Sequence, residues 1–227
     1  MARTLDVAVH TVRRDTFVEA AQRLIVTEGY EQMSVQDVLD EVDASRGAFY
    51  HYFDSKGALL DAVVERMVDQ ATTRVEPIAT DSSLTATGRL SGIFTGIADW
   101  KGEQADLILG ILDAWLADEN AIVREKVRRH ILERLTPLLT TILRDGRASG
   151  EFSLTAPEET ARVVISLVLG ANETASRLFV ARQAGSVEVD EVVRVLAAFA
   201  EALERIVGAE PGSLPIADEA LIRRWYT

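Results

Sequence analysis

The sequence predicts an all-α protein, and three observations favour that fold class. Apolar residues recur every three or four positions in almost every segment, which is the period of a helix with one buried face. The alternation of polar and apolar residues that is typical of strands is scarce, and the turn signals lie between the helical segments. Apolar residues make up 48% of the 227 positions, which is enough for a substantial core.

The first predicted helix covers residues 13–28. One of its faces carries five apolar side chains, namely Phe17, Ala20, Ala21, Leu24 and Ile25. Gly29 follows directly, and a glycine in this place ends a helix because it adopts the left-handed conformation without strain. This helix is therefore expected to pack its apolar face on the elements that follow.

Two short helices are predicted next, joined by a tight turn. Ser34 caps the first of them, over residues 35–42, and Asp37 supplies a weak capping-box partner three positions later. The turn "DAS" then leads into Ser45, which caps the second short helix, over residues 46–53.

Further helices fill the rest of the chain. The fourth begins at Asp54 or Ser55 and runs to about residue 75, and residues 76–88 form the clearest linker because proline, serine and threonine cluster there. The tail after residue 210 reads as turn with a last helical turn. The remaining predicted helices cover residues 85–101, 105–117, 119–148, 157–183 and 189–207.

The two short helices, supported by the first helix, match a helix-turn-helix. Its second helix would lie in a DNA major groove with its first residues, here Arg46, Gly47 and Ala48, at the base edges. Arginine bonds guanine through two atoms, or a phosphate, and the two small residues let the backbone approach. The methyl group of Ala48 suits a thymine methyl group.

Four aromatic rings and a histidine occupy residues 49–53. Phe49 and Phe53 are four positions apart and are expected to face the core. Tyr50, His51 and Tyr52 lie on the outward sides, where they can donate to phosphates. A purely structural aromatic segment accounts for the two phenylalanines, but poorly for three polar-tipped rings between Arg46 and Lys56.

Helix N-termini add to this surface, since their free N–H groups and dipole favour an anion. Lys56 stands at the start of the fourth helix, and Ser34 and Ser45 place two further N-termini near the same DNA backbone.

From about Arg13 to Met67 the chain resembles the DNA-binding domain of the TetR family of transcription regulators. The signature "EGYEQMSVQDVLDEVDASRGAFYHYFDSKGALLDAV" carries the resemblance. It implies a DNA-binding domain in residues 1–56 and a helical effector-binding and dimerisation domain in residues 57–227. It also implies phosphate contacts from Ser34, Tyr50, Tyr52 and Lys56, and base contacts from Arg46, Gly47 and Ala48.

Three positions depart from the family pattern. The family usually has a small residue at Leu39, glycine at Asp43 and often glutamate at Gly57. Aspartate tolerates the left-handed turn conformation, so Asp43 is compatible with the turn. Because Leu39 is larger than the usual residue, the family pattern does not give the crossing angle of the two short helices.

The charge balance limits how this domain can bind DNA. The whole chain carries a formal net charge of -12, and residues 1–56 hold six basic and ten acidic side chains. Binding therefore depends on a few placed contacts and not on a broad positive field. Those contacts are the three helix N-termini, the tyrosine and histidine donors, Arg46, Lys56, and whichever of Arg3, Arg13 and Arg14 reach the DNA backbone.

The last two long helices are apolar on more than one face, whereas a surface helix needs one apolar stripe. A second apolar face needs a second partner, which favours a four-helix interface between two copies of the chain over one helix buried in a single subunit. The family uses its last helices in this way. The predicted interface residues are Val164, Val168, Ala175, Val192, Leu196, Phe199 and Leu203.

Gly88, Gly92 and Gly96 fall on one face of a predicted helix. Each mid-helix glycine costs ~1 kcal/mol relative to alanine, so the stripe needs a reason. Either a neighbouring helix packs closely, or the missing side chains leave room for a ligand. In the second case a largely apolar pocket would be lined by Ile93, Phe94, Gly96, Ile97, Trp100, Leu112, Trp115 and Asn172. Asn172 is either the polar anchor of that pocket or a group that faces its twin across the dimer.

Other classes of function fit poorly. The three histidines have no metal spacing, cysteine is absent, and neither a GxGxxG motif nor a P-loop occurs, so no catalytic, metal or cofactor site is expected. No apolar run at the N-terminus resembles a signal peptide, and the run around residues 163–171 is too short for a membrane span. The basic run over residues 124–134 reads as a solvated helix face.

The sequence therefore predicts a cytoplasmic, ligand-responsive repressor, which is not an enzyme. It would bind a near-palindromic double-stranded DNA operator as a homodimer and be released by a small, largely apolar effector. The alternatives are a transcriptional activator, or a ligand-binding or scaffold dimer with weak or no DNA binding.

Overall fold

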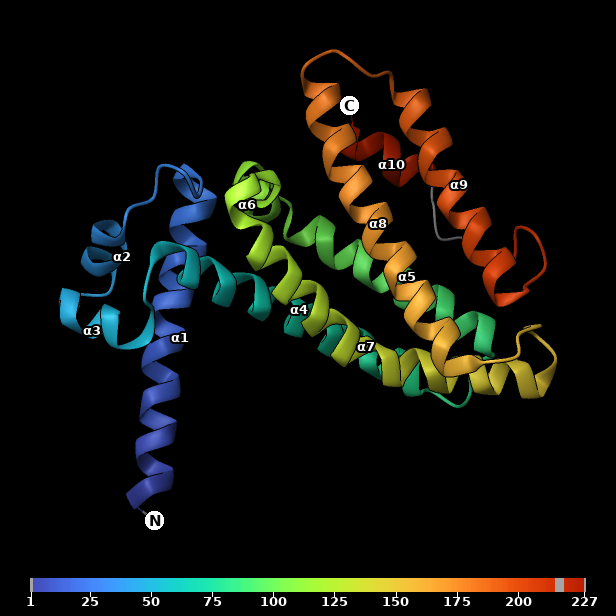
Figure 1. Cartoon of the computed structure of the whole chain (residues 1–227), viewed down its shortest axis with the longest axis horizontal. Helices are drawn as coiled ribbons and strands as arrows, with labels where there is room; N and C mark the ends of the chain where they lie inside the picture. Colours follow the sequence, from blue (N-terminus) through green and yellow to red (C-terminus); the bar gives the residue numbers. More distant parts are fainter. Residues whose placement is uncertain (1, 215–218, 227) are drawn as a thin grey trace. The chain divides into compact units, whose positions relative to one another are not determined.

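The computed structural model describes residues 2–214 and 219–226, with side chains from residue 12 onward. Within these ranges every regular element is a helix, which confirms the all-α prediction (Figure 1). The elements are α1 (Ala2–Glu28), α2 (Val35–Glu41), α3 (Arg46–Tyr52), α4 (Lys56–Thr80), α5 (Ala86–Glu103), α6 (Ala105–Leu116), a 3-10 turn η1 (Asp118–Asn120), α7 (Ala121–Ser149), α8 (Pro157–Gln183), α9 (Val189–Val207) and α10 (Glu219–Tyr226).

The predicted bounds of α8 and α9 agree with the structure, whereas the predicted linker over residues 76–88 is wrong for its first half. There α4 continues through Pro77 to Thr80. A proline inside a helix removes one backbone hydrogen bond, and here tertiary packing outweighs that loss, because Val75 and Ala79 on either side are 0% and 2% exposed. The tail was also underestimated, since it forms an eight-residue helix.

The chain divides into two compact units, each made of two stretches of sequence. One unit is Met1–Gln70 with Lys101–Val127, and the other is Ala71–Trp100 with Arg128–Thr227. The predicted division after residue 56, between a DNA-binding domain and an effector-binding domain, concerns function and not compactness. It stays a prediction.

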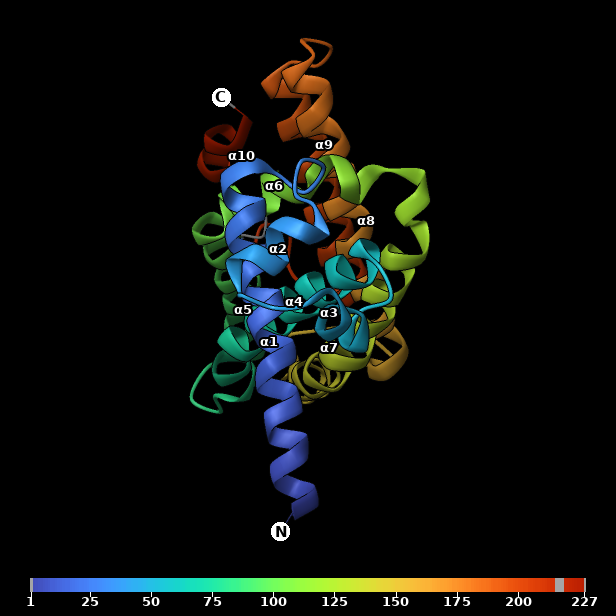
Figure 2. The ribbon, with the colours of Figure 1, turned by 90° about the vertical axis from the view of Figure 1, so that its left-hand side faces the viewer.

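The core of the first unit is aromatic where α1 meets α3. Phe17 of α1 is 1% exposed and lies edge-on to Phe49 and Phe53, with ring centroids 5.7 and 6.2 Å away. Figure 2 shows α2 and α3 against α1 in this unit. The spacing of four between the two phenylalanines, read from the sequence as a core face, is confirmed.

In the same unit α6 packs on the last turns of α1. A Cβ at Gly110 would lie 2.6 Å from the carbonyl oxygen of Ile25, so only glycine allows this approach. The Gly110 carbonyl also accepts a 2.9 Å hydrogen bond from the Tyr30 N–H, just after α1 ends. Through these contacts α6 holds the loop between α1 and α2.

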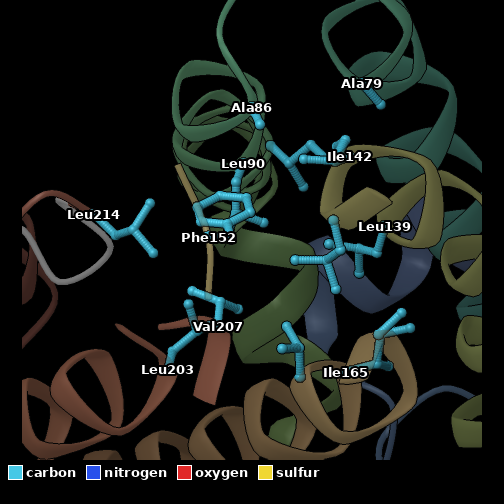
Figure 3. Close-up of a cluster of buried hydrophobic side chains, with 14 of the residues drawn as sticks. Ala79, Ala86, Leu90, Leu139, Ile142, Phe152, Ile165, Leu203, Val207 and Leu214 are labelled. Carbon is cyan, nitrogen blue, oxygen red and sulfur yellow. The ribbon is translucent and has the colours of Figure 1, made fainter. Parts of the chain in front are cut away.

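The core of the second unit gathers side chains from α4, α5, α7, α8 and α9 around Phe152, which lies in the loop between α7 and α8 (Figure 3). Gly146 lets the Phe152 ring pack directly on α7, because a Cβ there would collide with the ring. The cluster includes Leu90, Ile142, Leu203 and Val207, each at most 1% exposed.

The start of α5 is held by a carboxylate from that same loop. Glu151 accepts hydrogen bonds from the Ala86 and Thr87 N–H groups at 3.1 and 2.8 Å, and from the Ser149 hydroxyl at 2.8 Å. Burial by itself would raise the pKa of Glu151, but these hydrogen bonds outweigh it and lower the pKa to about 2. The carboxylate thus satisfies N–H groups that a helix start leaves without partners.

The last helix, α10, covers the ends of α8 and α9. Ile222 and Tyr226 are buried with Val192 of α9, and the Tyr226 hydroxyl donates to the Ala175 carbonyl of α8 at 2.7 Å. Arg223 pairs with Asp190 at the start of α9 at 2.8 Å. The chain end therefore closes a second, smaller apolar cluster.

Candidate nucleic-acid interface

The first short helix begins with the predicted capping box. The Ser34 hydroxyl accepts from the Asp37 N–H at 3.2 Å, and the Asp37 carboxylate accepts from the Ser34 N–H at 2.7 Å. The hydrogen bonds from Ser34 lower the pKa of Asp37. Ser34 is exposed and Asp37 is partly exposed, so the N-terminus of α2 is open to a phosphate.

The turn between the short helices contains Asp43 at φ +47°, the one non-glycine residue with positive φ among those described. Aspartate tolerates this left-handed conformation, as the sequence predicted. Leu39 is 3% exposed, and its carbonyl accepts from the Ala44 N–H at 3.0 Å. The larger side chain is thus accommodated inside the motif.

The second short helix presents its N-terminus to solvent. The Ser45 hydroxyl accepts from the Ala48 N–H at 3.2 Å and so caps α3. Arg46 and Gly47 are exposed, and a Cβ on Gly47 would meet only the Ser45 hydroxyl, at 3.9 Å. The residues predicted to read bases therefore have open space in front of them.

The aromatic cluster divides in phase with the helix. Tyr50 is 50% exposed and stands edge-on to Phe49 at 5.4 Å, so a core residue fixes an outward-facing phenol. Since Arg46 and Tyr50 are four residues apart, they share one face of α3. His51 is exposed, but the Tyr52 ring is half-buried, with its centroid 5.9 Å from that of Phe17.

Lys56 is the first residue of α4, and Ser55 caps that helix by accepting from the Ala58 N–H at 3.1 Å. The Lys56 ammonium lies 4.2 Å from the centroid of the Tyr30 ring and donates to the Glu31 carbonyl at 3.2 Å. Ser55 and Tyr30 are additions to the predicted site. The sequence left the helix start between Asp54 and Ser55, and nothing in it indicated the contact with Tyr30.

Tyr30 is a neutral support for that ammonium. It is 7% exposed, and burial together with Glu31 and Glu119 raises its pKa to about 12. A ring face attracts a cation, so Tyr30 positions Lys56 without neutralising its charge.

Several other basic side chains of the first unit are engaged in internal contacts. Arg23 pairs with Glu41 at 2.9 Å and Arg66 with Glu19 at 2.8 Å. Arg14 lies over the Phe53 ring at 5.4 Å, and Arg13 is exposed. The Arg3 side chain, also considered from the sequence, lies outside the described side chains. These pairings agree with a surface that depends on a few placed contacts.

The residues of this motif also match a family model. The model of the bacterial regulatory proteins of the tetR family matches residues 17–63, which span the end of α1, the two short helices and the start of α4. Residues 17–63 therefore carry the DNA-binding motif of the TetR family. The relatives that match the chain are named transcriptional regulators.

Curated relatives are more similar in the DNA-binding part than over their full length. The chain is 42% identical over 71 residues to the uncharacterized HTH-type transcriptional regulator YuxN of Bacillus subtilis, an alignment that covers 30% of this chain and 24% of that protein. It is 25% identical over 137 residues to the HTH-type transcriptional repressor DhaR of Mycobacterium sp., covering 60% of this chain and 68% of DhaR. The chain thus spans about a quarter of YuxN and two thirds of DhaR.

Solved structures share the fold across most of the chain. The crystal structure of RolR without ligand superposes with a TM-score of 0.60 at 17% identity, covering 93% of this chain and 95% of RolR. The regulatory protein TetR from Rhodobacter sphaeroides superposes with a TM-score of 0.54 at 19% identity, covering 85% and 97%. The shared fold therefore includes the helices beyond the matched motif.

The glycine stripe of α5 faces α4. A Cβ at Gly92 would lie 2.6 Å from Ile78 Cγ2, and one at Gly96 would lie 3.0 Å from Val75 Cγ1. Gly88 faces Thr85 of its own first turn. Of the two alternatives left open by the sequence, the geometry at Gly92 and Gly96 favours the close helix contact.

The other predicted pocket residues differ in burial. Ile93 is 2% exposed inside the core cluster, so it packs there and does not line open space, which corrects the prediction for this residue. On the same helix Phe94 and Ile97 are half-buried against that cluster, and Trp100 is 9% exposed. Asn172 of α8, in the same unit, is half-buried. In the other unit Leu112 is 9% exposed and Trp115 is half-buried.

Three predicted interface residues are corrected. Val164 and Leu203 are 0% and 1% exposed in the large core cluster, and Val192 is 0% exposed beneath α10. They contact their own subunit and have no surface left for a partner. Val168, Ala175, Leu196 and Phe199 are half-buried and keep exposed surface.

On α8 the exposed apolar surface lies beside the predicted interface residues Val164, Val168 and Ala175. Val163 is 50% exposed, and Leu167, Gly170 and Thr174 on the same side are partly exposed. In the part of the chain that the structure describes, α8 is the one helix long and apolar enough to cross a membrane by length and composition, with mean hydropathy 1.4. Only 11% of that stretch is buried in the subunit.

The described residues include no group of three or more histidine, aspartate or glutamate side chains placed to hold a metal ion. The chemistry of the interface therefore consists of hydrogen-bond donors, two cations and helix N-termini, all suited to an anionic backbone and to base edges.

Proposed function

We propose that this regulator is a repressor that binds a near-palindromic DNA operator as a homodimer and releases it when a small, largely apolar effector binds. The observation that carries the DNA-binding part is the placement of Arg46 and Tyr50. They share the exposed face of a capped recognition helix, whose position on α1 is fixed by the buried Phe49. Ser34, Ser45 and Lys56 add donors at three helix starts.

A change of one hydroxyl tests this surface. Tyr50→Phe keeps the ring on Phe49 and removes only the exposed donor, so DNA binding is expected to weaken about five- to tenfold per subunit, the loss of one hydrogen bond to phosphate. Fluorescence anisotropy with a DNA fragment obtained by selection from random sequences measures it. Unchanged affinity in a variant with an unchanged melting temperature would exclude Tyr50 from the interface. Failure of the wild-type protein to select any DNA would favour the scaffold alternative.

The homodimer rests on the exposed face of α8. Burial of the partly exposed apolar side chains of α8 by a partner stabilises a dimer by about 25 cal/mol for each Å² of apolar surface removed from water. Leu196 and Phe199 of α9 extend this partly exposed surface. In a two-fold dimer the same surface of a second copy packs against it. The half-sites of a near-palindromic operator would reflect the same symmetry.

Gly170 gives a clean test of that interface. A Cβ added there meets no atom of the subunit within 4 Å, so Gly170→Leu leaves the subunit intact and places a bulky side chain on the α8 face. Gly102 in α5 is equally open, and Gly102→Leu is the matched control. Sedimentation velocity should show Gly170→Leu shifted toward monomer and Gly102→Leu unchanged. A Gly170→Leu dimer as stable as the wild type would place the interface elsewhere.

The effector is proposed to bind in residues 57–227, where Phe94, Ile97 and Trp100 of α5 supply apolar surface. The relative DhaR is named a transcriptional repressor, which favours repression as the function of this chain as well. An effector must bind the DNA-free state more tightly in order to release the operator. A screen of apolar compounds for operator release, measured by anisotropy, tests this part, and the same assay in a reporter strain separates repressor from activator. We place the protein in the cytoplasm, with its operator.

A further inference from the structure

A groove lined by both charged and apolar side chains lies between α7 and α8 in the second unit. Its volume is about 710 Å³, within the range of small-molecule sites. It shares no residue with the DNA-binding surface or with the predicted apolar pocket. The residues that line it are Arg129, Leu132, Glu133, Thr136, Pro137, Thr140, Thr141, Arg144, Glu158, Arg162 and Ser166.

The lining combines cations with hydroxyl groups. Three arginines face two glutamates, which leaves one positive charge in a chain whose net charge is -12. Arg162 lies 3.4 Å from Glu158 on the exposed side of α8 and is 65% exposed, so its guanidinium can turn toward the groove. Guanidinium groups bind carboxylates and phosphates through two parallel hydrogen bonds.

One hydroxyl in the lining lacks a hydrogen-bond partner. Thr140 is 6% exposed, and among the described residues its Oγ1 has neither donor nor acceptor. Its neighbours differ, because the Thr136 hydroxyl donates to the Leu132 carbonyl at 2.6 Å and that of Thr141 to the Pro137 carbonyl at 3.1 Å. A buried polar group without a partner is unfavourable, and native proteins rarely keep one without a use.

Pro137 lies in the same wall and changes the hydrogen bonding of α7. It has no N–H, so the carbonyl four residues before it, that of Glu133, lacks its usual helical partner. The groove thus offers a hydroxyl donor at Thr140 and guanidinium groups on both helices, beside apolar surface from Leu132 and Pro137. This set fits a ligand with an anionic group on a small organic frame.

We propose that this groove is a second ligand site, which binds a small organic anion bearing a carboxylate or a phosphate. Arg162 pairs with the anionic group, and the Thr140 hydroxyl donates to it. The site is independent of the apolar effector, so the regulator has two inputs of different chemistry.

Thr140→Val is the first test, because it keeps the shape and removes only the unpaired hydroxyl. Without ligand this variant should melt at a higher temperature than the wild type, since an unsatisfied group has been replaced by a methyl. The probes are inorganic phosphate and citrate, each compared with potassium chloride at equal ionic strength. The wild type should gain thermal stability from at least one probe beyond the chloride effect, and Thr140→Val should lose most of that gain.

Arg162→Gln is the second test, with Arg205→Gln as its control. Arg205 pairs with Glu201 four residues earlier at 2.9 Å, just as Arg162 pairs with Glu158, but it does not line the groove. Calorimetric titration should show affinity for the effective probe reduced about tenfold or more in Arg162→Gln, the loss of a charge-assisted hydrogen bond, and unchanged in Arg205→Gln. The better of the two probes then decides between phosphate and carboxylate.

Three results would overturn the proposal. The first is a wild-type protein that responds to both probes only as it does to chloride. The second is an equal loss in Arg162→Gln and Arg205→Gln, which would mean a diffuse charge effect. The third is a change of sedimentation in Arg162→Gln with unchanged anion binding, which would make the groove a contact between subunits.

Discussion

Replacing Gly92 by alanine measures how closely α5 approaches α4. The added Cβ would lie 2.6 Å from Ile78 Cγ2, whereas favourable carbon–carbon contacts begin near about 3.5 Å. The gap must therefore open by roughly 1 Å, either by separation of the helices or by movement of Ile78. Ile78 yields poorly, since a β-branched side chain has one strongly preferred rotamer in a helix.

Two effects of opposite sign decide the outcome. Alanine in place of a mid-helix glycine raises the free energy of unfolding by ~1 kcal/mol. Overpacking lowers it by ~1–3 kcal/mol, so Gly92→Ala is expected to lose about 1 kcal/mol net. At Gly102 a Cβ meets no atom within 4 Å, and there the first effect acts alone. Gly102→Ala should therefore gain up to ~1 kcal/mol.

A double-mutant cycle assigns the loss to the contact. Ile78→Ala removes Cγ2, so Gly92→Ala in that background should become stabilising, with a coupling free energy of about 1–3 kcal/mol. Urea denaturation at one fixed protein concentration measures all four proteins, because the stability of a dimer depends on concentration. The reasoning fails if Gly92→Ala stabilises the wild-type protein as much as Gly102→Ala does, or if the coupling is zero.

Three further predictions concern single residues. Lys56→Ala should weaken operator binding almost equally for all sequences and lower the salt slope by about 0.9 per subunit, measured by anisotropy at several ionic strengths with Arg205→Ala as the charge control; an unchanged slope would remove Lys56 from the DNA backbone. Arg46→Ala should alter the selected sequence, at ~1–3 kcal/mol for a lost base contact, and an identical selection result would leave Arg46 as a phosphate contact only. Glu151→Gln should lower the melting temperature at pH 7. Because the pKa of Glu151 is about 2 when folded and 4.5 ordinarily, the carboxylate's contribution is complete above about pH 4.5 and is lost toward pH 2, so the difference from wild type should shrink over that range; a difference independent of pH would refute the capping role.

Local patterns predicted the DNA-binding motif well. The caps at Ser34 and Ser45, the inward phase of Phe49 and Phe53 and the tolerance of Asp43 all depend on residues within a few positions of one another. Hydrogen bonds to the nearest turn and the helical period decide such features, and both can be read from the chain itself.

Features that depend on distant partners were predicted less well. Two apolar faces on α8 were visible in the sequence, but nothing local says that Val164 meets the subunit core while Val163 stays half exposed. Pro77 predicts the end of a helix, but α4 continues through it because its neighbours Val75 and Ala79 are buried. Gly110 is a lone glycine in an apolar helix, and such a glycine often has a packing reason. The sequence does not say that the neighbour is the backbone of Ile25.

The contact between Gly110 and Ile25 has a consequence for the biosynthesis of the protein and for its engineering. The unit that holds the helix-turn-helix is completed by residues 101–127, which leave the ribosome well after residue 70. Until then the end of α1 and the Tyr30 amide lack their partners on α6. The unit that holds the helix-turn-helix therefore cannot complete its folding as soon as residues 1–70 have been translated. A chimaera that joins this motif to another regulator at residue 56 keeps the recognition helix but loses Gly110, on which the end of α1 packs. A graft of the operator specificity therefore has to bring α6 along with the first four helices.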